Sequence, residues 1–456
     1  MNKPKYFGTN GIRGVVNDLI TPIFVTKMGY AIGSFVSKGS IVVGADARTS
    51  SPFIKNAIIS SLLASGLEVI DVGTLPTPAL QFAVTHFEAK LGVMVTASHN
   101  PPEFNGIKVV DSDGIEISIS KQLEIEEIYE KNLTHLAKWD KISSITKYNV
   151  LPLYIDQIVN QVNQDLIRKA NLTVVVDAGN AVGGLVTPYL LKKLGVRVIT
   201  INAHLDGSFP GRGSEPLPEK LTLMAQAIRM SNAHFGVAHD GDADRAIFGD
   251  NSGTVHYGDR SIALFEKWVL SSSSKKLFVT PVSSSKVVED IAEELGGEII
   301  WTPVGCINVS RKMIETSAVI GGEENGGLFY APHQSVRDGP MAAALMTELI
   351  SETNEKLEVL FNQLPKYFQL KDKVPCKNNN KTTVMEYIKE NAPSANEVIT
   401  IDGIKLIYDE GWVLIRPSGT EPIFRVFVEA TTDEKAKELM SNSKNLLMSA
   451  IKMCSD

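Results

Sequence analysis

One arrangement of strand-like and helix-like segments occurs three times along the chain of 456 residues. In each copy, a run rich in Val, Ile and Leu is followed by a segment with apolar residues at helical spacing and by a second apolar run; the copies start at residues 41, 172 and 276. Continuous apolar runs are typical of parallel strands whose sheet is covered on both faces. The pattern predicts one type of α/β domain used three times.

A further apolar run in each copy leads directly into an unusual polar motif. The three motifs are VTASHNPP (95–102), HDGDADR (239–245) and GGEENGG (321–327). Open α/β sheets bind ligands beyond the carboxyl ends of their strands. We therefore expect each copy to present one functional loop at the end of a strand.

The C-terminal segment follows a different pattern. WVLIRPSGTEPIFRVFVEA (412–430) reads as two strands around a polar loop, and the segment after it as an amphipathic closing helix. This predicts a smaller α+β domain. The predicted domains are three related α/β domains with mixed, largely parallel sheets at 1–149, 150–251 and 252–366, and the α+β domain at 367–456.

The composition narrows the class of protein. Hydrophobic residues make up 43% of the chain and the formal charge is −7, which argues against bulk nucleic-acid binding, because that role needs a basic face. A cleft can still be locally basic and bind a small anion. No apolar run is long enough for a membrane span, no signal-peptide core is present, and the three cysteines are scattered. These features predict a cytoplasmic protein without nucleic-acid or membrane partners.

HDGDADR contains the strongest metal-binding pattern. Asp240, Asp242 and Asp244 alternate, so in an extended loop their carboxylates point the same way. Oxygen ligands of this kind suit Mg²⁺ or Ca²⁺. A calcium EF-hand loop needs Gly at its sixth position and Glu at its twelfth, where this chain has Arg245 and Asn251. Arg245 beside a metal suggests phosphate recognition.

Ser98 follows a strand but lacks the GxSxG context of a hydrolase nucleophile. A structural reading is a turn capped by serine and stopped by Asn-Pro. The functional reading is that Ser98 carries a phosphoryl group, which would complete the coordination of a metal held by the three aspartates.

Three further loops are rich in anion-binding or hydroxyl-binding groups. RPSGTEPIFR (416–425) combines arginines, hydroxyls and a glycine as an anion nest would. GGEENGG offers carboxylate and amide groups suited to sugar hydroxyls, with glycines that permit close approach. GTNGIRG (8–14) brings one cation, Arg13, to a glycine-rich loop.

TASHNP, DGDADR, GEENGG and RPSGTEP, in this order and at this spacing, resemble the α-D-phosphohexomutase family over essentially the whole chain. The family includes phosphoglucomutase, phosphomannomutase and phosphoglucosamine mutase, and the variant sugar loop resembles its archaeal branch. The resemblance implies four domains around a central cleft. It implies exchange of phosphate between O1 and O6 of a hexose through a phosphoserine, a hexose 1,6-bisphosphate and Mg²⁺.

The resemblance also implies residue roles. Lys108 is a candidate general base, which would require a lowered pKa. Ser98, Asp240, Asp242 and Asp244 are the expected Mg²⁺ ligands. The other implied residues are Ser98, His99, Lys108, Arg13 and Arg245 at the reacting phosphate; Glu323, Asn325, Thr302 and Gly305 toward the sugar; and Arg416, Ser418, Gly419, Thr420 and Arg425 at the other phosphate.

One position departs from many bacterial relatives, which have a histidine where this chain has Gly327. The proton-transfer role proposed for that histidine would then fall to His99 or Lys108. A dedicated phosphoglucosamine mutase, a Mg²⁺-dependent sugar phosphatase and a sugar-phosphate sensor remain as alternatives. A hinge near residue 366 is expected to close the last domain over the cleft. The preferred hexose and the oligomeric state stay open.

Overall fold

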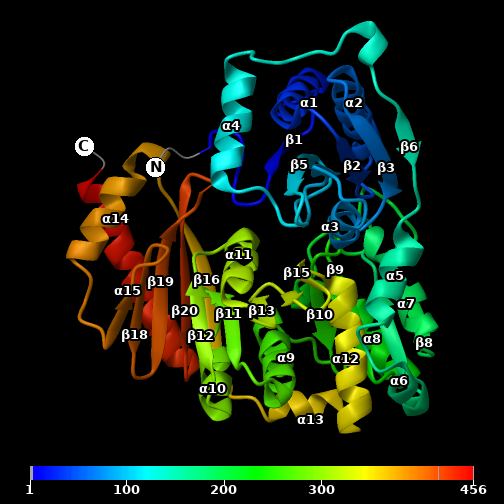
Figure 1. Ribbon diagram of the computed structural model, residues 1–456. Coiled ribbons are helices and arrows are strands. Elements are labelled where there is room, and N and C mark those ends of the chain that lie inside the picture. The colour runs from blue at the N-terminus through cyan, green and yellow to red at the C-terminus, as the bar shows by residue number, and fades with distance from the viewer. Residues whose placement is uncertain (1–3, 420, 455–456) are drawn as a thin grey trace.

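The computed structural model describes residues 4–419 and 421–454, which form four sheets in four domains, numbered I to IV along the chain (Figure 1). The sheet of domain I has the strand order β1-β5-β4-β2-β3-β6. Its elements are β1 (Ile12–Val15), α1 (Pro22–Val36), β2 (Ser40–Ala45), α2 (Ser51–Ala64), β3 (Glu68–Thr74), α3 (Thr77–His86), β4 (Leu91–Val95), β5 (Phe104–Asp111), α4 (Ile119–Glu130) and β6 (Ile145–Lys147).

Domains II and III contain sheets of order β10-β9-β7-β8 and β12-β11-β13-β14-β15. In domain II lie α5 (Leu151–Val159), α6 (Gln164–Ala170), β7 (Thr173–Asp177), α7 (Thr187–Lys193), β8 (Arg197–Ile201), α8 (Thr222–Ser231), β9 (Phe235–His239) and β10 (Ala246–Gly249). In domain III lie α9 (Gly258–Ser272), β11 (Leu277–Pro281), α10 (Lys286–Leu295), β12 (Glu298–Thr302), α11 (Cys306–Thr316), β13 (Ile320–Glu323), β14 (Gly327–Tyr330), β15 (Gln334–Arg337), α12 (Gly339–Thr353) and α13 (Leu357–Asn362).

The three α/β sheets share one topology. A central strand, β2, β7 or β11, lies between two parallel neighbours. The outer neighbour β4, β9 or β13 is followed by an antiparallel strand, β5, β10 or β14. The predicted use of one domain type three times is therefore confirmed.

Local sequence signals explain where helices begin and end. The Ser285 side chain accepts a hydrogen bond from Val287 N at the start of α10, and Gly296 ends that helix in the left-handed conformation at φ 64°. Asp338 caps α12 in the same way, with Pro340 in its first turn. Such caps satisfy backbone groups that the helix itself leaves unpaired.

Domain IV is an antiparallel sheet of order β16-β20-β19-β18-β17 with helices packed against it, as the sequence predicts. It lies beside domain III in Figure 1, coloured orange to red. Its elements are β16 (Phe368–Pro375), α14 (Lys381–Glu390), β17 (Glu397–Ile399), β18 (Ile404–Tyr408), β19 (Gly411–Pro417), β20 (Ile423–Ala430) and α15 (Asp433–Met453). The division of the chain at 149, 251 and 366 stays a prediction.

Two kinds of core hold the domains. One continuous apolar core includes Val42 of domain I, Val174 of domain II and Phe265 of domain III. Domain IV has a separate core, and a small cluster that includes Val282 and Trp412 joins it to domain III. Burial of apolar area is the main stabilising term, and the shared core joins domains I to III, whereas only a small apolar cluster joins domain IV to domain III.

Candidate active site

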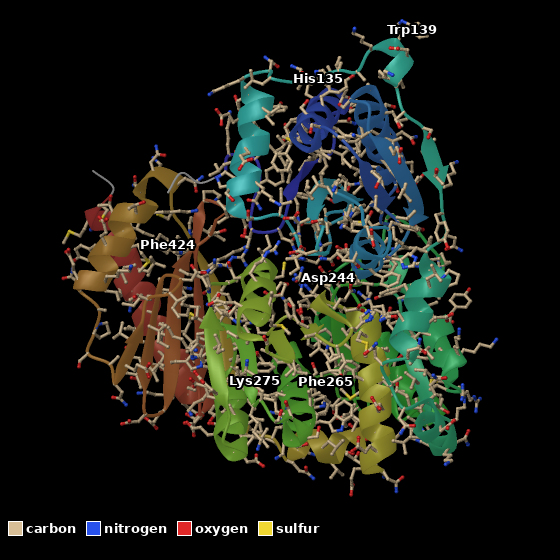
Figure 2. The ribbon with its side chains drawn as sticks, in the orientation of Figure 1. His135, Trp139, Asp244, Phe265, Lys275 and Phe424 are labelled. Atoms are coloured by element: carbon tan, nitrogen blue, oxygen red, sulfur yellow. The ribbon has the colours of Figure 1, made fainter. Side chains whose placement is uncertain are left out.

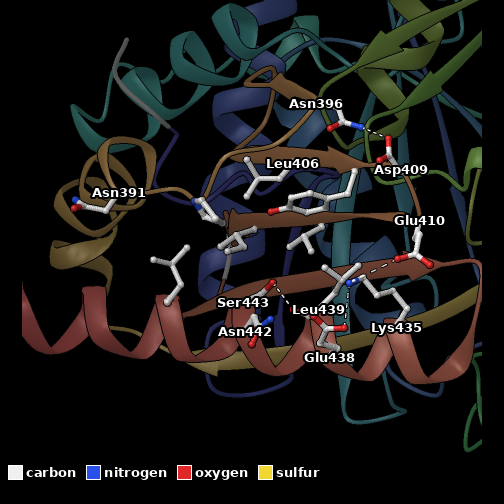
Figure 3. Close-up of a pocket in the computed structure, with 15 residues that line it drawn as sticks. Asn391, Asn396, Leu406, Asp409, Glu410, Lys435, Glu438, Leu439, Asn442 and Ser443 are labelled. Carbon is white, nitrogen blue, oxygen red and sulfur yellow. Dashed lines mark hydrogen bonds and ion pairs between the residues drawn. The ribbon is translucent and has the colours of Figure 1, made fainter.

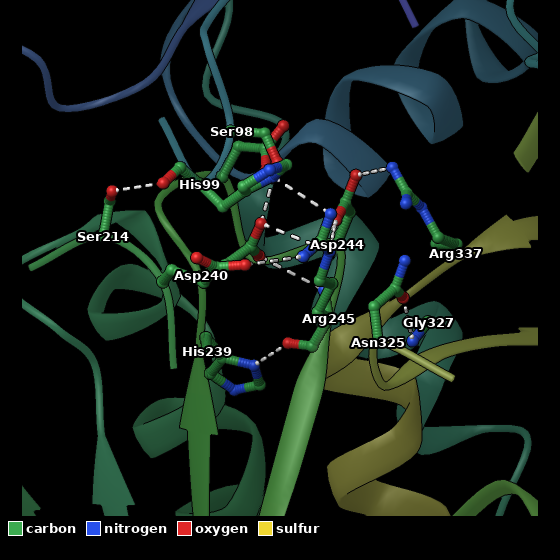
Figure 4. Close-up of polar contacts among 12 residues, drawn as sticks. Ser98, His99, Ser214, His239, Asp240, Asp244, Arg245, Asn325, Gly327 and Arg337 are labelled. Atoms are coloured by element: carbon green, nitrogen blue, oxygen red, sulfur yellow. Dashed lines mark hydrogen bonds and ion pairs between the residues drawn. The ribbon is translucent and has the colours of Figure 1, made fainter. Parts of the chain in front are cut away.

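The three polar motifs lie on equivalent connections, β4–β5, β9–β10 and β13–β14. They meet near the middle of the molecule, where Figure 2 labels Asp244. A hydrogen bond from Ser98 to Asp240 joins the first connection to the second, and Arg337 joins the second to the third (Figure 4). One site is thus assembled from three domains.

Arg48 holds the connection that carries Ser98. This arginine is buried, and Asp46 accepts a hydrogen bond from its Nε at 3.1 Å. A guanidinium has five donors in a fixed plane, so one side chain can hold several carbonyl groups of a loop at once. Its terminal nitrogens donate to the backbone oxygens of Ser98, Asn100, Pro101 and Phe104.

Ser98 has an unusual backbone conformation, with φ 50° in the left-handed region. Non-glycine residues adopt it only where the surroundings enforce it, and such strain gathers at functional sites. The Ser98 Oγ is buried and donates to Asp240 Oδ2 at 2.8 Å. A Cβ on Gly241 would lie 2.4 Å from the Ser98 carbonyl oxygen. Glycine at 241 therefore lets the loop at 240–245, called the metal loop after its expected ligand, approach Ser98.

The aspartate cluster fits a divalent cation. Asp240, Asp242 and Asp244 are buried, and their carboxylates each offer an oxygen within 4.8 Å of the others. Among the described residues, Asp242 Oδ1 and Asp244 Oδ1 are buried without a hydrogen-bond partner. Burial and the two neighbouring carboxylates raise the pKa of Asp240 well above its usual value. Three oxygen donors that cannot all ionise unaided suit Mg²⁺.

Lys108 lies on β5 and reaches the same carboxylates. Its Nζ is 2.7 Å from Asp242 Oδ2 and 3.2 Å from Asp244 Oδ2. Burial favours the neutral amine, but the two carboxylates outweigh it and raise the pKa of Lys108 above its usual value. In this state of the site Lys108 is a paired ammonium, so the lowered pKa that a general base would require is not present, and the assignment of Lys108 as the base stays a prediction.

Arg245, at the end of the metal loop, faces His99 in the loop that carries Ser98. Arg245 Nη2 lies 3.0 Å from His99 Nδ1, and its Nε is buried without a hydrogen-bond partner in the described chain. Burial and the positive charges of Arg245 and Arg13 lower the pKa of His99 well below its usual value. His99 is thus a neutral imidazole that accepts at Nδ1, which leaves Nε2 as its donor.

Arg13 reaches the same site from β1. It pairs in the sheet with Gly106, and its Nη1 donates to Asn100 Oδ1 at 3.1 Å. Its buried Nε has no partner among the described residues. The glycine-rich segment 8–14 therefore does bring its one cation, the Arg13 guanidinium, beside the loop that carries Ser98.

The sugar-loop candidates adjoin the metal loop through an arginine. Glu323 is buried, and its Oε2 accepts from Arg337 Nη1 at 3.0 Å. Asn325 Oδ1 accepts from the backbone N–H of Gly327 at 3.0 Å, which closes the turn between β13 and β14. Burial raises the pKa of Glu323, although Arg337 opposes the shift.

The remaining candidates lie at the edge of this site. Thr302 is buried and donates to the Pro303 carbonyl, while Gly305, with φ 133°, precedes α11. A Cβ on Gly305 would lie 2.7 Å from Thr9 Cγ2, and one on Gly419 would lie 3.6 Å from Thr9 Oγ1. Loops of domains I, III and IV therefore approach one another at Thr9.

The domain IV arginines pair within their own domain. Arg416 Nε donates to Asp402 Oδ2 at 2.9 Å, and Arg425 Nη2 donates to Glu421 Oε2 at 2.5 Å. Ser418 is buried beside them. Thr420 lies outside the described residues. This loop therefore approaches Thr9 of domain I, and among the described residues its arginines make no hydrogen bond to Ser98 or to the aspartates.

A separate cavity of about 620 Å³ lies in domain IV, between the sheet and α15 (Figure 3). Leu406 and Leu439 line it, with Lys435 and Glu438 at its rim. None of the described site candidates lines this cavity. It is therefore distinct from the polar site between the domains.

Models of one family match along the chain. The phosphoglucomutase/phosphomannomutase alpha/beta/alpha domains I, II and III match residues 4–135, 152–253 and 257–368, and the C-terminal domain of the same proteins matches 373–443. The chain belongs to the phosphoglucomutase/phosphomannomutase family. The resemblance noted from the motifs is therefore confirmed.

Relatives of this family align over nearly the full length. A phosphoglucomutase/phosphomannomutase of Thermococcus kodakarensis is 41% identical, over 98% of this chain and 99% of that protein. A phosphoglucosamine/phosphogalactosamine mutase of Sulfurisphaera tokodaii is 42% identical, over 97% and 99%. The crystal structure of a family protein from Burkholderia thailandensis superposes with a TM-score of 0.87 at 28% identity, over 99% of this chain and 98% of that one.

Four supporting residues escaped the motif analysis. Thr77 donates from Oγ1 to Asp242 Oδ2 at 2.6 Å, and His239 Nδ1 contacts the Arg245 carbonyl at 2.8 Å. Arg48 and Arg337 are the other two. Thr77 begins a helix and Arg337 ends a short strand, so neither stands in a recognisable motif, whereas His239 directly precedes the aspartates. In the described chain, no helix combines the length and the hydrophobicity needed to cross a membrane.

Proposed function

We propose that the protein is a phosphohexomutase that interconverts hexose 1-phosphates and hexose 6-phosphates. The observation that carries this proposal is the Ser98 Oγ at 2.8 Å from Asp240 within a buried aspartate cluster. A separate arginine-containing loop of domain IV approaches domain I at Thr9. The names of the aligned relatives support the same activity.

The proposed reaction consists of two phosphoryl transfers. In the first, the bond from phosphorus to Ser98 Oγ breaks, a bond to the free sugar hydroxyl forms, and the hydroxyl proton passes to a base. The hexose 1,6-bisphosphate then turns over in the cleft. In the second, its other phosphoryl group returns to Ser98 Oγ and the released sugar oxygen regains a proton. Such transfers depend mainly on positioning and charge stabilisation.

The cations of the site suit those needs. Arg245 and Arg13 each have a buried Nε without a partner in the described chain, so donors remain for phosphate oxygens. His99 holds Arg245 through Nδ1 and can donate from Nε2. We assign these three residues to orientation and charge stabilisation of the transferring group.

Asp240, Asp242, Asp244 and the Ser98 phosphate would hold Mg²⁺. The ion would neutralise charge on the transferring phosphate and on the two carboxylates that now accept hydrogen bonds from the Lys108 ammonium. Burial, together with the cation Arg13, would then favour the neutral amine. Lys108 is therefore the proposed base, in a loaded site only.

Glu323 and Asn325 are assigned to the sugar hydroxyls. Thr302 and Gly305 are assigned to the adjacent edge of the cleft. Arg416, Ser418, Gly419, Thr420 and Arg425 are assigned to the phosphate that is not transferred. Because the loop of domain IV is separate from the reacting serine, it can hold either end of a sugar bisphosphate.

³¹P NMR tests the proposal. The protein with Mg²⁺ and a trace of glucose 1,6-bisphosphate is given the 6-phosphates of glucose, mannose, glucosamine and N-acetylglucosamine in turn. The expected result is the matching 1-phosphate, and the relative rates give the preference. Growth of inorganic phosphate alone would show a sugar phosphatase and refute the proposal.

A dedicated phosphoglucosamine mutase is the second candidate. Several aligned relatives bear the name probable phosphoglucosamine mutase. The same NMR series separates the two, since a dedicated enzyme would convert glucosamine 6-phosphate and leave the glucose and mannose phosphates unchanged.

A further inference from the structure

The space beside Gly327 is filled by another residue. A Cβ at 327 would lie 2.4 Å from Arg337 Cδ, 2.9 Å from Arg337 Cγ and 3.1 Å from Asn325 Oδ1. Gly327 is not among the glycines with positive φ, so its backbone would accept a side chain. The Arg337 stem is therefore the main obstacle to a larger residue at 327, the position where many bacterial relatives have a histidine.

Arg337 links the sugar loop to the metal loop. Its Nη1 donates to Glu323 Oε2 at 3.0 Å. Its Nη2 donates to Asp244 Oδ2 at 2.5 Å (Figure 4). The side chain is only 6% exposed. If the Asn10 amide is oriented with its oxygen toward Arg337, it accepts from Nη2 at 2.9 Å. One guanidinium thus touches loops of domains I, II and III.

The charge of Glu323 depends on this arginine. Glu323 is buried, and burial raises its pKa. The positive charge of Arg337 is the main effect that opposes this rise. Its neighbour Glu324 points elsewhere, accepting from Ser283 Oγ at 3.0 Å. Without Arg337, a buried carboxylate would lose its cation and would take up a proton or turn toward water.

We propose that Arg337 is a positioning residue for sugar recognition. It occupies the space of a side chain at 327 and holds Glu323, as a carboxylate, against the metal loop and toward the sugar. The two acids lie on different loops, and the planar fork of arginine spans both, whereas an ammonium is a single point of charge. This inference rests on the proposed function, because it assigns Glu323 to the sugar.

A double-mutant cycle tests the proposal. The variants are Arg337→Met, Glu323→Gln and the double substitution, with Arg337→Lys as the conservative change. KM and kcat are measured for glucose 1-phosphate and glucosamine 1-phosphate. We expect Arg337→Met and Glu323→Gln each to raise KM about tenfold, with kcat within about threefold. The KM of the double variant should not exceed the higher of the two single-variant KM values. Arg337→Lys should raise KM less than Arg337→Met does.

The outcomes separate clearly. Multiplied effects on KM in the double variant would show that Arg337 does not act through Glu323. A fall in kcat at unchanged KM would place its action on Asp244. Either result overturns the inference while wild-type turnover still supports the mutase. If the wild type does not isomerise either sugar, the proposed function fails, and the same cycle is then measured as Kd for glucose 6-phosphate by calorimetry.

Gly327→Ala tests the shared space independently of Glu323. In the wild-type background the new methyl group displaces Arg337, so KM should rise about as much as in Arg337→Met. In an Arg337→Ala background, which lacks the Cγ and the Cδ that the new methyl group would meet, Gly327→Ala should change KM by less than about twofold. A neutral Gly327→Ala in the wild-type background would contradict the packing argument.

Discussion

The site between domains I to III and the loop of domain IV both contain cationic side chains paired with carboxylates, but the two regions hold them differently. Lys108 and Arg337 are almost completely buried, and each contacts a carboxylate in another domain. Arg425 is 44% exposed, and its partner Glu421 lies in the same loop. Removing one member of a buried pair costs several kcal/mol, whereas an exposed pair contributes little. The buried site is therefore built for fixed chemistry, and the loop for reversible binding.

The two regions should therefore control different kinetic parameters. Groups that act on the transferring phosphate should affect kcat, and groups that hold the far phosphate should affect KM. Domain IV has its own core, whereas domains I to III share one. Closure by a hinge near residue 366 remains a prediction.

Ser98→Ala should have the largest effect. We expect turnover to fall by roughly 10⁴-fold or more, because no other group would accept the phosphoryl. The fold should persist, since Arg48 holds the loop through the backbone carbonyl of residue 98 and not through the side chain. The measurement is conversion of glucose 1-phosphate, with the thermal midpoint as control. Activity near that of the wild type would contradict the assignment of Ser98 as the residue that accepts the phosphoryl group, and with it the contrast between the two regions.

Lys108→Met should have the next largest effect, on stability. It leaves Asp242 and Asp244 buried without this cation, which should cost about 3–5 kcal/mol in the free energy of unfolding. In the proposed function Mg²⁺ would bind the same acids, so it should stabilise this variant more than the wild type.

Urea unfolding with EDTA and with Mg²⁺ measures both predictions. Lys437→Met, at an exposed i,i+4 pair on α15, is the matched control and should change neither curve. Equal stabilisation of wild type and Lys108→Met by Mg²⁺ would argue against a metal at these aspartates.

Asp259, at the contact between domains III and IV, should make the free energy of unfolding depend on pH. Burial, with the charges of Glu324 and Glu429, raises its pKa to about 7. Its contribution to stability is therefore full below about pH 4, the unfolded value, and is lost as the pH rises through about 7. We expect a change on the order of 3 kcal/mol across this window.

The comparison of wild type with Asp259→Asn isolates this term. Buried His239, whose pKa burial lowers to about 4, adds a slope of opposite sign between about pH 4 and 6.5 in both proteins. The difference between the two unfolding free energies should fall steadily from pH 4 to 7. A difference that stays constant from pH 4 to 7 would contradict the raised pKa of Asp259 at the domain contact.

Arg416→Ala should have the smallest of the four effects. We expect KM to rise about 10- to 100-fold with kcat within about threefold, since the loop binds the phosphate that does not react. Arg425→Ala should raise KM less, because the Arg425 side chain is 44% exposed, whereas that of Arg416 is 12% exposed. A fall in kcat at unchanged KM for Arg416→Ala would contradict the division between the two regions.

The repeat and the motifs predicted much of the fold and the serine–aspartate cluster, for a physical reason. Strand periodicity and loop chemistry are local, so Ser98 and the alternating aspartates can be recognised from neighbours in sequence. Arg48 and Arg337 could not be recognised, because each acts over a long sequence separation: Arg48 lies 50 residues before Ser98, and Arg337 lies 93 residues after Asp244.

The direction of the Lys108 pKa could not be predicted for a related reason. It depends on the balance between burial and two carboxylates supplied by another domain. A local pattern does not contain that balance. The absence of a side chain at Gly327 was visible in the sequence, but its consequence appeared only with the Arg337 stem in the same space.

The most direct measurement is the location of the phosphoryl group on the protein. Wild type, Ser98→Ala and Arg416→Ala are incubated with Mg²⁺ and saturating glucose 1,6-bisphosphate, quenched, digested and mapped by mass spectrometry. The account predicts one phosphoryl group on Ser98 in the wild type and in Arg416→Ala, and none in Ser98→Ala. A phosphoryl group on another residue, or its persistence in Ser98→Ala, would contradict it.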